Sequence, residues 1–554
     1  MSQTSPSGFR NVVDPAVAKR YRAEGWWGDL TLADHVERHA AERPDSVAYA
    51  SGDRVMTYDG YRRTSDRLAG ALAGAGLEPG ERVAVILPDG PTVHVAFLAN
   101  EKAGLTTVGI GARAGERELR HLLDKTGATA LVSLSEHHQR DMRSVFEALR
   151  AGGLPLRRHV VVPRFEDDLL AAIRIDGVPA HVDGGGLASL ISGRRLGPDD
   201  LFMINSTSGT TGLPKCVMHT QNRWMYFHQK AVEVAALTER DVVLSALPAP
   251  FGFGLWTAHF TPTLLGAPTV VMERFSAEMA LELIDRLRVT MLCTVSTQFI
   301  MLLNSPDLER RDLSSLRVMF TGGEAVPYDR ARAFEERTGA AVLQFYGSNE
   351  SGVVTGTRLS DPPDRRLRTA GRLVSGTELR LFDEGRDVTD SGRGQPGSRG
   401  PATCVGYLDD PAANSELFTP DGYVLHADIC TVDGEGYLSV VGRKSDIIIR
   451  GGKNISAAQV EDEVSAHPAV ALAAAVPMKD PIFGERVCVY VELRPGGSLT
   501  LPDLISFLEA RGTSKETMPE HLVVVDELPR SSGGKLAKGE LRAGLAESTS
   551  TELS

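Results

Sequence analysis

The stretch Ser206-Thr207-Ser208-Gly209-Thr210-Thr211-Gly212-Leu213-Pro214-Lys215 is the most informative part of this 554-residue chain. It interleaves small hydroxyl residues with two glycines and ends on a lysine. Glycine lets a backbone approach a ligand closely, and amides, hydroxyls and an ammonium all donate to phosphate oxygens. The stretch therefore predicts a loop that binds a nucleoside triphosphate. The residues expected to bind are Ser206, Thr207, Ser208, Gly209, Thr210, Thr211, Gly212 and Lys215.

Two other interpretations of this loop are weaker. A P-loop has a glycine directly before its lysine and a Ser or Thr directly after it. Here Leu213 and Pro214 stand between the last glycine and the lysine, and Cys216 follows the lysine. A plain surface turn of Gly, Ser and Thr would explain the composition. It would not explain the further motifs described below.

Short apolar segments separated by helical patterns surround the loop and indicate an α/β fold. Residues 201–204 lead directly into it, and residues 82–87, 130–133 and 159–162 have the same strand-like character. This alternation is typical of a parallel sheet covered by helices, which binds ligands at the carboxyl ends of its strands. A second α/β run covers residues 220–345.

The pattern changes in the last third of the chain. Short strands with glycine turns between about 365 and 442 predict a small β-barrel, and the residues after 447 predict a compact α+β domain. Near the start, Thr31 is expected to cap a helix over 32–40. We expect a large N-terminal domain of two α/β subdomains plus the barrel, over residues 1–443.

Composition excludes several classes of function. The chain has 60 basic and 72 acidic residues and a net charge of −12, which argues against nucleic acid as a partner. Its five cysteines include no CxxC pair, so neither a zinc site nor a disulfide framework is indicated. The N-terminus lacks a basic-plus-apolar signal, and polar residues interrupt the long apolar stretches. We expect a cytoplasmic monomer or homodimer without a membrane span.

Four motifs in order resemble those of the adenylate-forming superfamily, which contains acyl- and aryl-CoA synthetases, peptide-synthetase adenylation domains and luciferases. The first is the loop at 206–215. The second, third and fourth are Tyr346-Gly347-Ser348-Asn349-Glu350, Asp428 with Gly442-Arg443-Lys444-Ser445-Asp446, and Leu528-Pro529-Arg530-Ser531-Ser532-Gly533-Gly534-Lys535. The resemblance covers residues from about 30 to about 545 and is closest to aromatic and alicyclic acid:CoA ligases. It implies ATP, Mg²⁺ and coenzyme A as ligands.

The resemblance also implies a role for each motif residue. Glu350 is expected to hold Mg²⁺, a hard cation suited to carboxylate oxygens, and to act in catalysis with Thr207 and Lys535. Tyr346 is expected to stack on adenine, and Asp428 to accept hydrogen bonds from the ribose. The other residues expected to bind ATP or AMP are Gly323, Glu324, Gly347, Asn349 and Arg443.

Two half-reactions require two arrangements of the C-terminal domain. Formation of an acyl-AMP gives the acid a good leaving group, and the charge that accumulates at the α-phosphate must be neutralised. Lys535 can do this when its domain is docked, but it must leave before a thiol can approach. In contrast, Lys538 is expected to be a solvated charge.

The family moves this domain by rotation about a hinge. Here the hinge is expected at 444–446, with Ser445 as the pivot, followed by the mobile domain over 447–545 and a disordered tail over 546–554. Gly451 and Gly452 resemble the segment that lines the pantetheine tunnel.

The acid-binding segment is expected at 247–256. Amino-acid adenylating domains place an Asp where this chain has Gly252, because a buried ammonium needs a carboxylate; dihydroxybenzoate activators have an Asn there. No Lys or Arg occurs at 247–256, 320–326 or 345–354, so a second carboxylate would be unpaired. With room expected at Gly252 and Gly254, the sequence predicts a broad, neutral, ring-bearing acid. The pocket residues expected are Phe251, Gly252, Phe253, Gly322, Gly347 and Gly352.

These observations predict an ATP-dependent carboxylic acid:CoA ligase acting on an aromatic or alicyclic monocarboxylate. The alternative is a stand-alone aryl-acid adenylating enzyme that loads an acyl carrier protein, because residues 20–27 are similar to those of dihydroxybenzoate-activating enzymes. A non-catalytic nucleotide-binding regulator is disfavoured by the intact Glu350 and Lys535.

Overall fold

The computed structural model describes residues 15–165, 173–180, 191–207, 214–323, 326–443, 446–450, 453–515, 517–530 and 536–551. Its helices are α1 Pro15–Ala23, α2 Leu32–Glu42, α3 Tyr58–Gly74, α4 Pro91–Ala103, α5 Glu116–Thr126, α6 Met142–Ala151, α8 Gln221–Ala235, α9 Gly252–Gly254, a π-helix at Leu255–Phe260, α10 Thr261–Leu265, α11 Ala277–Leu287, α12 Ser296–Asn304, α13 Tyr328–Thr338, α14 Pro363–Arg368, α15 Pro411–Leu417, α16 Ala457–Ser465, α17 Leu501–Ala510 and α18 Lys538–Thr551. Short 3-10 turns lie at Pro306–Glu309 and Thr389–Ser391. None of the helices in these ranges is long and apolar enough to cross a membrane.

The first large sheet has nine strands in the order β10-β9-β8-β5-β3-β4-β11-β12-β23. Its central neighbours β8, β5, β3, β4 and β11 are parallel, as the alternating pattern predicted. Strand β11 leads to the loop at 206–215 that is predicted to bind phosphates, called the phosphate loop below, and β12 pairs antiparallel with β11. The strands are β3 Arg82–Ile86, β4 Thr106–Ile110, β5 Ala130–Ser133, β8 Arg158–Val161, β9 Arg174–Ile175, β10 Val178–Pro179, β11 Met203–Ser206, β12 Cys216–His219 and β23 Gly406–Tyr407.

The second large sheet also has nine strands, in the order β19-β18-β17-β16-β15-β13-β14-β1-β2. Strands β1, β14, β13, β15, β16 and β17 are parallel, and β2, β18 and β19 pair antiparallel at the two ends. The strands are β1 Val47–Ser51, β2 Arg54–Thr57, β13 Val243–Ser245, β14 Thr269–Val271, β15 Met291–Cys293, β16 Val318–Gly322, β17 Ala341–Ser348, β18 Gly352–Gly356 and β19 Arg372–Leu373.

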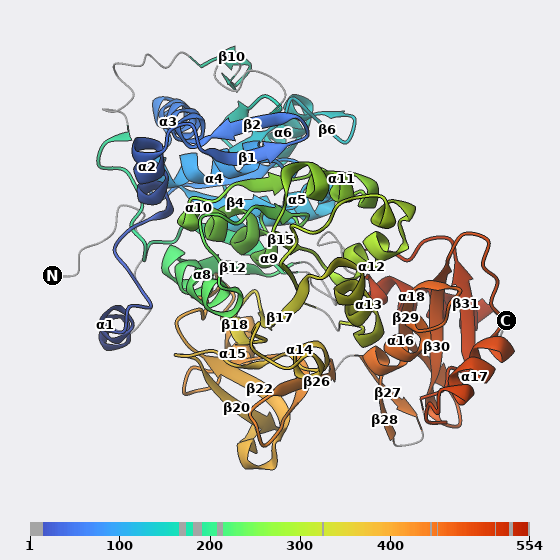
Figure 1. Cartoon of the computed structure of the whole chain (residues 1–554). Coiled ribbons are helices and arrows are strands. Elements are labelled where there is room, and N and C mark those ends of the chain that lie inside the picture. The colour runs from blue at the N-terminus through green and yellow to red at the C-terminus, as the bar shows by residue number, and fades with distance from the viewer. Residues whose placement is uncertain are drawn as a thin grey trace.

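Each large sheet contains a strand from a distant part of the chain. The early strand β1 pairs with β14 of the second sheet, and the late strand β23 pairs with β12 of the first. The two α/β subdomains are therefore tied together rather than following one another simply along the chain. In Figure 1 the blue helices α2 and α3 lie above the green helix α8.

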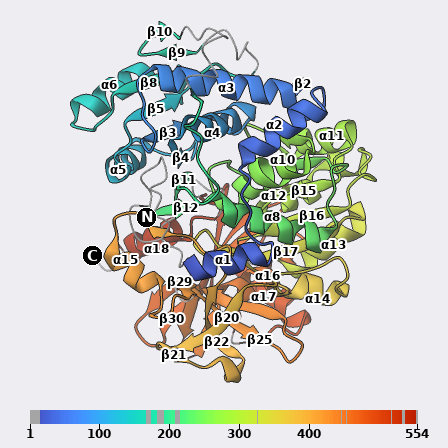
Figure 2. The same cartoon turned by 90° about the vertical axis from the view of Figure 1, so that its left-hand side faces the viewer.

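Helix α2 shows how local sequence sets these elements. It begins at Leu32 as predicted, and the Asp34 carboxylate accepts the backbone N–H of Thr31 at 2.8 Å. This contact satisfies one of the free amides at a helix start. Helix α1 lies apart from α2 (Figure 2), and shortly after α1 the indole of Trp27 donates to the carbonyl of Pro401.

A smaller sheet occupies the place of the predicted β-barrel. Its strands are paired in the order β21-β20-β22-β25-β26, with β24 on β22. Because the end strands β21 and β26 are not paired to each other in this order, the barrel is not confirmed. The strands are β20 Glu378–Asp383, β21 Arg386–Asp387, β22 Arg393–Arg399, β24 Val424–Leu425, β25 Asp428–Val432 and β26 Leu438–Arg443. A separate hairpin comprises β6 Glu136–His137 and β7 Arg140–Asp141.

The C-terminal region is a compact α+β unit, as predicted, and packs against α12 and α13 (Figure 1). The backbone N–H of Tyr328 donates to Asp462, and Arg511 pairs with Asp329 at 2.9 Å. Helix α18 runs to Thr551, so the backbone is helical over much of the predicted disordered tail. The strands of this unit are β27 Ile447–Arg450, β28 Lys453–Ser456, β29 Val470–Asp480, β30 Gly484–Leu493 and β31 His521–Val525.

Candidate active site

Asp428 and Arg443, both from the third motif, face each other on the adjacent strands β25 and β26. The register of β25 and β26 pairs them directly, and Arg443 Nε lies 3.7 Å from Asp428 Oδ1. The hydroxyl of Tyr346 donates to Asp428 Oδ2 at 2.9 Å. Three residues predicted to bind the nucleoside are therefore in one place, and the carboxylate retains lone pairs for further donors.

The ring of Tyr346 is less accessible than its predicted stacking role suggests. It is 8% exposed, and His426 stacks on it with ring centroids 5.2 Å apart. His426 Nε2 lies 2.9 Å from the hydroxyl of Ser398. Burial lowers the pKa of His426, so this ring is neutral at pH 7. The observed arrangement orients the Asp428 carboxylate.

Glu350 lies in the turn between β17 and β18, where its carboxylate meets a residue from the other large sheet. The hydroxyl of Tyr407 donates to Glu350 Oε1 at 2.7 Å. The ammonium of Lys215 lies 4.9 Å from the centroid of the same tyrosine ring. Burial and the neighbouring Glu350 raise the pKa of Tyr407, so its hydroxyl keeps its proton. The predicted carboxylate and the loop lysine thus share one aromatic neighbour.

The two ends of the phosphate loop are held together. The backbone N–H of Thr207 donates to the carbonyl of Lys215 at 3.0 Å, and the N–H of Lys215 donates to Thr207 Oγ1 at 3.3 Å. Ser206 is buried, and its hydroxyl has no hydrogen-bond partner in the described ranges. A buried hydroxyl without a partner is uncommon, which makes Ser206 a candidate donor to a ligand.

Arg223 is a buried cation beneath the turn that carries Glu350. It is 1% exposed and forms no ion pair with the described residues. Its guanidinium instead donates to the carbonyls of Asn349 at 2.7 Å, Glu350 at 3.1 Å and Ala402. Burial lowers its pKa to about 10, which still leaves it charged at pH 7. Arg223 therefore fixes the backbone of the turn.

A chain of hydrogen bonds continues from Arg223 to the phosphate-loop strand. Arg223 contacts Nδ1 of His219, and His219 Nε2 lies 2.6 Å from Asn205 Oδ1. The amides of Asn205 and Asn349 then exchange hydrogen bonds of 2.7 and 3.2 Å. Burial lowers the pKa of His219, so the neutral ring accepts at one nitrogen and donates at the other.

The predicted room at Gly252 and Gly254 is absent. A Cβ at Gly252 would lie 3.1 Å from Asn349 Oδ1 and 3.2 Å from the ring of Trp224. A Cβ at Gly254 would lie 2.1 Å from the carbonyl oxygen of Pro248. The expectation of extra room was wrong. The side chains of Asn349 and Trp224 occupy the space beside Gly252, and the backbone of Pro248 occupies the space beside Gly254.

Backbone packing also explains three other glycines assigned to the acid pocket. A Cβ at Gly322 would lie 2.7 Å from the carbonyl oxygen of Phe345, and one at Gly347 would lie 1.8 Å from that of Gly352. Gly352 has a φ of +67°, which favours glycine. These residues would be glycine whatever the acid.

Aromatic rings gather beside the segment that follows. Phe253 stacks on Trp256 with centroids 5.7 Å apart, and Trp256 lies edge-on to Phe320 at 5.3 Å. Phe320 stacks on Phe345 at 5.2 Å. Trp256 belongs to the π-helix Leu255–Phe260, an irregularity that often marks functional sites.

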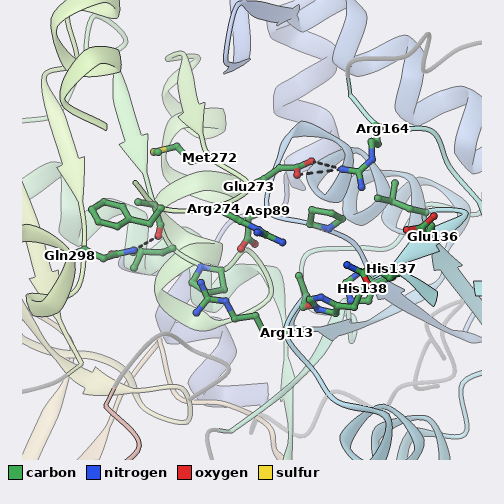
Figure 3. A pocket seen from close by; sticks show the side chains of 18 of the residues that line it. Asp89, Arg113, Glu136, His137, His138, Arg164, Met272, Glu273, Arg274 and Gln298 are labelled. Carbon is green, nitrogen blue, oxygen red and sulfur yellow. Dashed lines mark hydrogen bonds and ion pairs between the residues drawn. The ribbon is translucent and has the colours of Figure 1, made fainter. Parts of the chain in front are cut away.

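A cavity of about 730 Å³ lies beyond this segment, between the carboxyl ends of the two large sheets. Figure 3 shows Asp89, Arg113 and Arg274 directed into it, with Arg164 paired to Glu273. None of the predicted acid-pocket residues lines the cavity; its lining includes Leu247 and Pro248, just before them.

Asp89 links this cavity to residues 247–256, the segment predicted from the sequence to bind the acid. Its carboxylate accepts the backbone N–H of Ala249 at 2.7 Å. Burial raises the pKa of Asp89 to about 7, partly opposed by Arg113. It can therefore change its charge near neutral pH. His137 and His138 also lie in the cavity wall, and His138 Nε2 is 2.8 Å from the carbonyl of Ala112.

Several predicted residues lie outside the described ranges. These are Ser208, Gly209, Thr210, Thr211, Gly212, Glu324, Ser445, Gly451, Gly452 and Lys535. Gly323 is described and has a φ of +79°.

The prediction that Lys538 is a solvated charge was wrong, because its ammonium pairs with Glu461 at 2.6 Å.

Sequence reasoning missed Tyr407, Arg223, His219 and Asn205. Arg223 carried a weak signal, a cation followed by four bulky apolar or aromatic residues, Trp224 to Phe227. The role of Tyr407 depends on pairing between β12 and β23, which are far apart in sequence.

The described residues fit a metal ion held together with a nucleotide. They contain no group of three or more His, Cys, Asp or Glu residues able to form a closed metal site. Mg²⁺ in nucleotide enzymes is commonly bound by one or two carboxylates together with substrate phosphates. Glu350 could supply such a carboxylate, because Tyr407 occupies Oε1 and no described residue bonds to Oε2.

Comparisons with known proteins show the family of this chain. The family model described as AMP-binding enzyme matches residues 36–408, and that of the AMP-binding enzyme C-terminal domain matches residues 459–535. The chain is 33% identical to a medium-chain fatty-acid–CoA ligase of Escherichia coli (strain K12), over 94% of this chain and 92% of that protein.

It is also 33% identical to a 2-hydroxy-7-methoxy-5-methyl-1-naphthoate–CoA ligase of Streptomyces carzinostaticus, over 99% of both. The fold matches that of an anthranilate CoA ligase in complex with anthranoyl-AMP, with a TM-score of 0.82 and 24% identity, over 94% of this chain and 98% of that one. The chain therefore belongs to the AMP-binding enzyme family, as its motifs indicated.

Proposed function

We propose that this enzyme activates a ring-bearing monocarboxylic acid with ATP and transfers the acyl group to coenzyme A. The observation that carries the proposal is the convergence of the motif residues: Tyr346, Asp428 and Arg443 form one cluster, and Glu350 meets Lys215 through Tyr407. This arrangement suits a nucleotide with its ribose at Asp428 and its phosphates near the loop.

In the proposed first step, the acid carboxylate attacks the α-phosphate of ATP and pyrophosphate leaves. Lys215 and Lys535 would offset the charge that accumulates. Mg²⁺ on Glu350 would neutralise phosphate oxygens when bound. In the second step, a thiol attacks the acyl-AMP carbonyl and AMP leaves. We propose that the domain beginning near residue 447 turns about 444–446 between the steps, and that Gly451 and Gly452 admit the thiol.

The segments expected to line the acid pocket, 247–256, 320–326 and 345–354, contain no Lys or Arg, which supports a neutral acid. The nearest buried cation under the turn, Arg223, directs its donors to carbonyl groups and His219. A second carboxylate in the acid would therefore lack a partner. Rings at Phe253, Trp256 and Phe345 favour a flat acid.

The relatives leave the acid open. One 33%-identical protein is named for a fatty acid and another for a substituted naphthoate, so identity alone does not select a ring. The aromatic rings beside Phe253 are the reason for our choice.

Pyrophosphate release across a panel of acids tests this function. We expect a bicyclic or monocyclic aromatic acid to exceed straight-chain acids of six to ten carbons, and mass spectrometry to detect its CoA thioester. Efficient use of straight-chain acids with poor turnover of every ring acid would overturn the acid assignment. Transfer to a phosphopantetheinylated carrier protein but not to CoA would favour the alternative, an aryl-acid adenylating enzyme.

Lys535→Ala tests the division of the two steps. We expect it to slow acyl-AMP formation by more than about 100-fold, as for loss of a preorganised charge contact, while supplied acyl-AMP is still converted to thioester. Lys515→Ala, which removes an exposed lysine of the same domain, is the control. Equal loss of both steps in Lys535→Ala would contradict the separate role of this lysine.

A further inference from the structure

The backbone at Tyr407 is fixed from two sides. Strand β23 pairs Tyr407 with Val217 of β12. The Asn414 side chain accepts the N–H of Tyr407 at 2.7 Å and donates to its carbonyl at 2.8 Å. The ring therefore starts from a rigid position at the edge of the first large sheet.

The side chain of Tyr407 reaches across to the second large sheet. It is 7% exposed, and its hydroxyl is the sole hydrogen-bond partner of the Glu350 carboxylate in the part of the chain that the structure describes. Its ring faces the Lys215 ammonium. A cation over an aromatic face is attracted to it, more strongly when water is excluded.

The backbone and the side chain of Glu350 are held by different groups. Arg223 and the N–H of Cys404 bind the carbonyl of Glu350, the latter at 2.7 Å. These contacts fix the main chain but leave the carboxylate free to rotate. Tyr407 removes that freedom, because a hydrogen bond to an ionised oxygen is short and directional.

We propose that Tyr407 is a positioning residue that aims Glu350 Oε2 at a nucleotide-bound metal ion and aligns Lys215 with the phosphates. The inference rests on the proposed function, in which Glu350 holds Mg²⁺. It assigns no chemical step to the tyrosine: the phenol keeps its proton and touches neither substrate nor metal.

Tyr407→Phe isolates the hydroxyl, because the ring and its contact with Lys215 remain. The measurement is calorimetric binding of a non-hydrolysable ATP analogue to the full chain, with Mg²⁺ and with a chelator. We expect the variant to bind the Mg²⁺ complex about tenfold more weakly, as for loss of one hydrogen bond to a charged group. Binding without metal should be unchanged.

Tyr423→Phe is a matched control. Tyr423 is also buried, and its hydroxyl donates to Glu378 Oε2 at 2.9 Å, so the variant loses the same kind of hydrogen bond elsewhere. We expect the two variants to differ in Mg²⁺-dependent binding even if their melting temperatures fall equally. Equal effects of both variants on that binding would overturn the proposal.

Tyr407→Leu removes the ring as well. We expect metal-free binding of the analogue to weaken too, because Lys215 loses its aromatic neighbour; unchanged metal-free binding would overturn that part. Failure of the proposed function looks different: the unmodified enzyme would bind no ATP and release no pyrophosphate with any acid. An active, Mg²⁺-dependent enzyme whose Tyr407→Phe variant matches it would refute the role of Tyr407 alone.

Discussion

The turn around Glu350 and the segment around Gly252 both adjoin Asn349, but they are constrained in different ways. At Glu350 the chain is held by directional hydrogen bonds from Arg223, Cys404 and Tyr407. At Gly252 the constraint is steric, because Asn349 and Trp224 occupy the space beside the glycine. Polar contacts specify where a charged ligand group must lie, whereas steric contacts limit which shapes fit.

The largest effect is expected from Arg223→Met, which removes the hydrogen bonds that Arg223 makes to the turn around Glu350. Four buried groups would lose the hydrogen bond from Arg223, namely three carbonyls and His219 Nδ1, and of these the Glu350 carbonyl would keep its bond from the N–H of Cys404. An unsatisfied buried group costs about 1–3 kcal/mol, so the free energy of unfolding should fall by about 3 kcal/mol or more. Urea unfolding followed by circular dichroism measures this.

Arg366→Met is the control for that experiment. Arg366 is also buried, and it pairs with Glu335 at 2.9 Å. We expect both variants to lose stability, but among variants that remain folded only Arg223→Met should slow pyrophosphate release at saturating acid. Equal slowing in both would mean that Arg223 contributes to folding and not to the geometry of the turn.

A smaller effect is expected at Gly252, where the constraint is steric. Overpacking a filled site costs about 1–3 kcal/mol of folding stability. Gly252→Leu should therefore slow activation of ring acids and straight-chain acids alike, because it displaces Asn349 rather than closing spare room. Initial rates of pyrophosphate release with both kinds of acid provide the test. Selective loss of bulky ring acids would restore the original expectation of a roomy pocket.

A double variant sharpens the same point. Gly252→Ala places a methyl group 3.1 Å from Asn349 Oδ1, and Asn349→Thr shortens that neighbour. If the two residues interact, the loss caused by Gly252→Ala should be smaller in the Asn349→Thr background, a coupling that a double-mutant cycle measures. Additive effects would show that Asn349 is not the obstacle.

The same difference explains what the sequence could predict. Charged and polar motif residues such as Asp428 and Glu350 were recognisable because their chemistry restricts the residue type at each position. Gly252 was misinterpreted because a glycine in sequence does not reveal whether the space beside it is empty or filled. Lys538 was misassigned for a related reason: its partner Glu461 lies on α16, far along the chain.

Architecture was predictable where local patterns suffice. The helix starting at Leu32 and the strand at Ala130 follow from capping and apolar runs. The pairing of β1 with β14 and of β23 with β12 was not predictable, because each pair joins segments hundreds of residues apart. Tyr407 was missed on that account, since its position on β23 alone brings it to Glu350.

The smallest effect is expected from Asp428→Asn, which tests whether the charge of Asp428 serves nucleotide binding or only the stability of the fold. Asparagine can still accept the Tyr346 hydroxyl through its carbonyl oxygen but loses the charge that faces Arg443. Because Arg443 is 44% exposed, the pair contributes little to stability. We therefore expect the free energy of unfolding to be nearly unchanged.

The KM of the Asp428→Asn variant for ATP should rise about tenfold, equivalent to about 1.4 kcal/mol, while its KM for the acid stays constant. Steady-state kinetics with each substrate varied in turn separates the two constants. A parallel rise in both would place Asp428 in the general framework of the site, and the contrast between a charge-specified nucleotide region and a shape-limited acid segment would no longer hold.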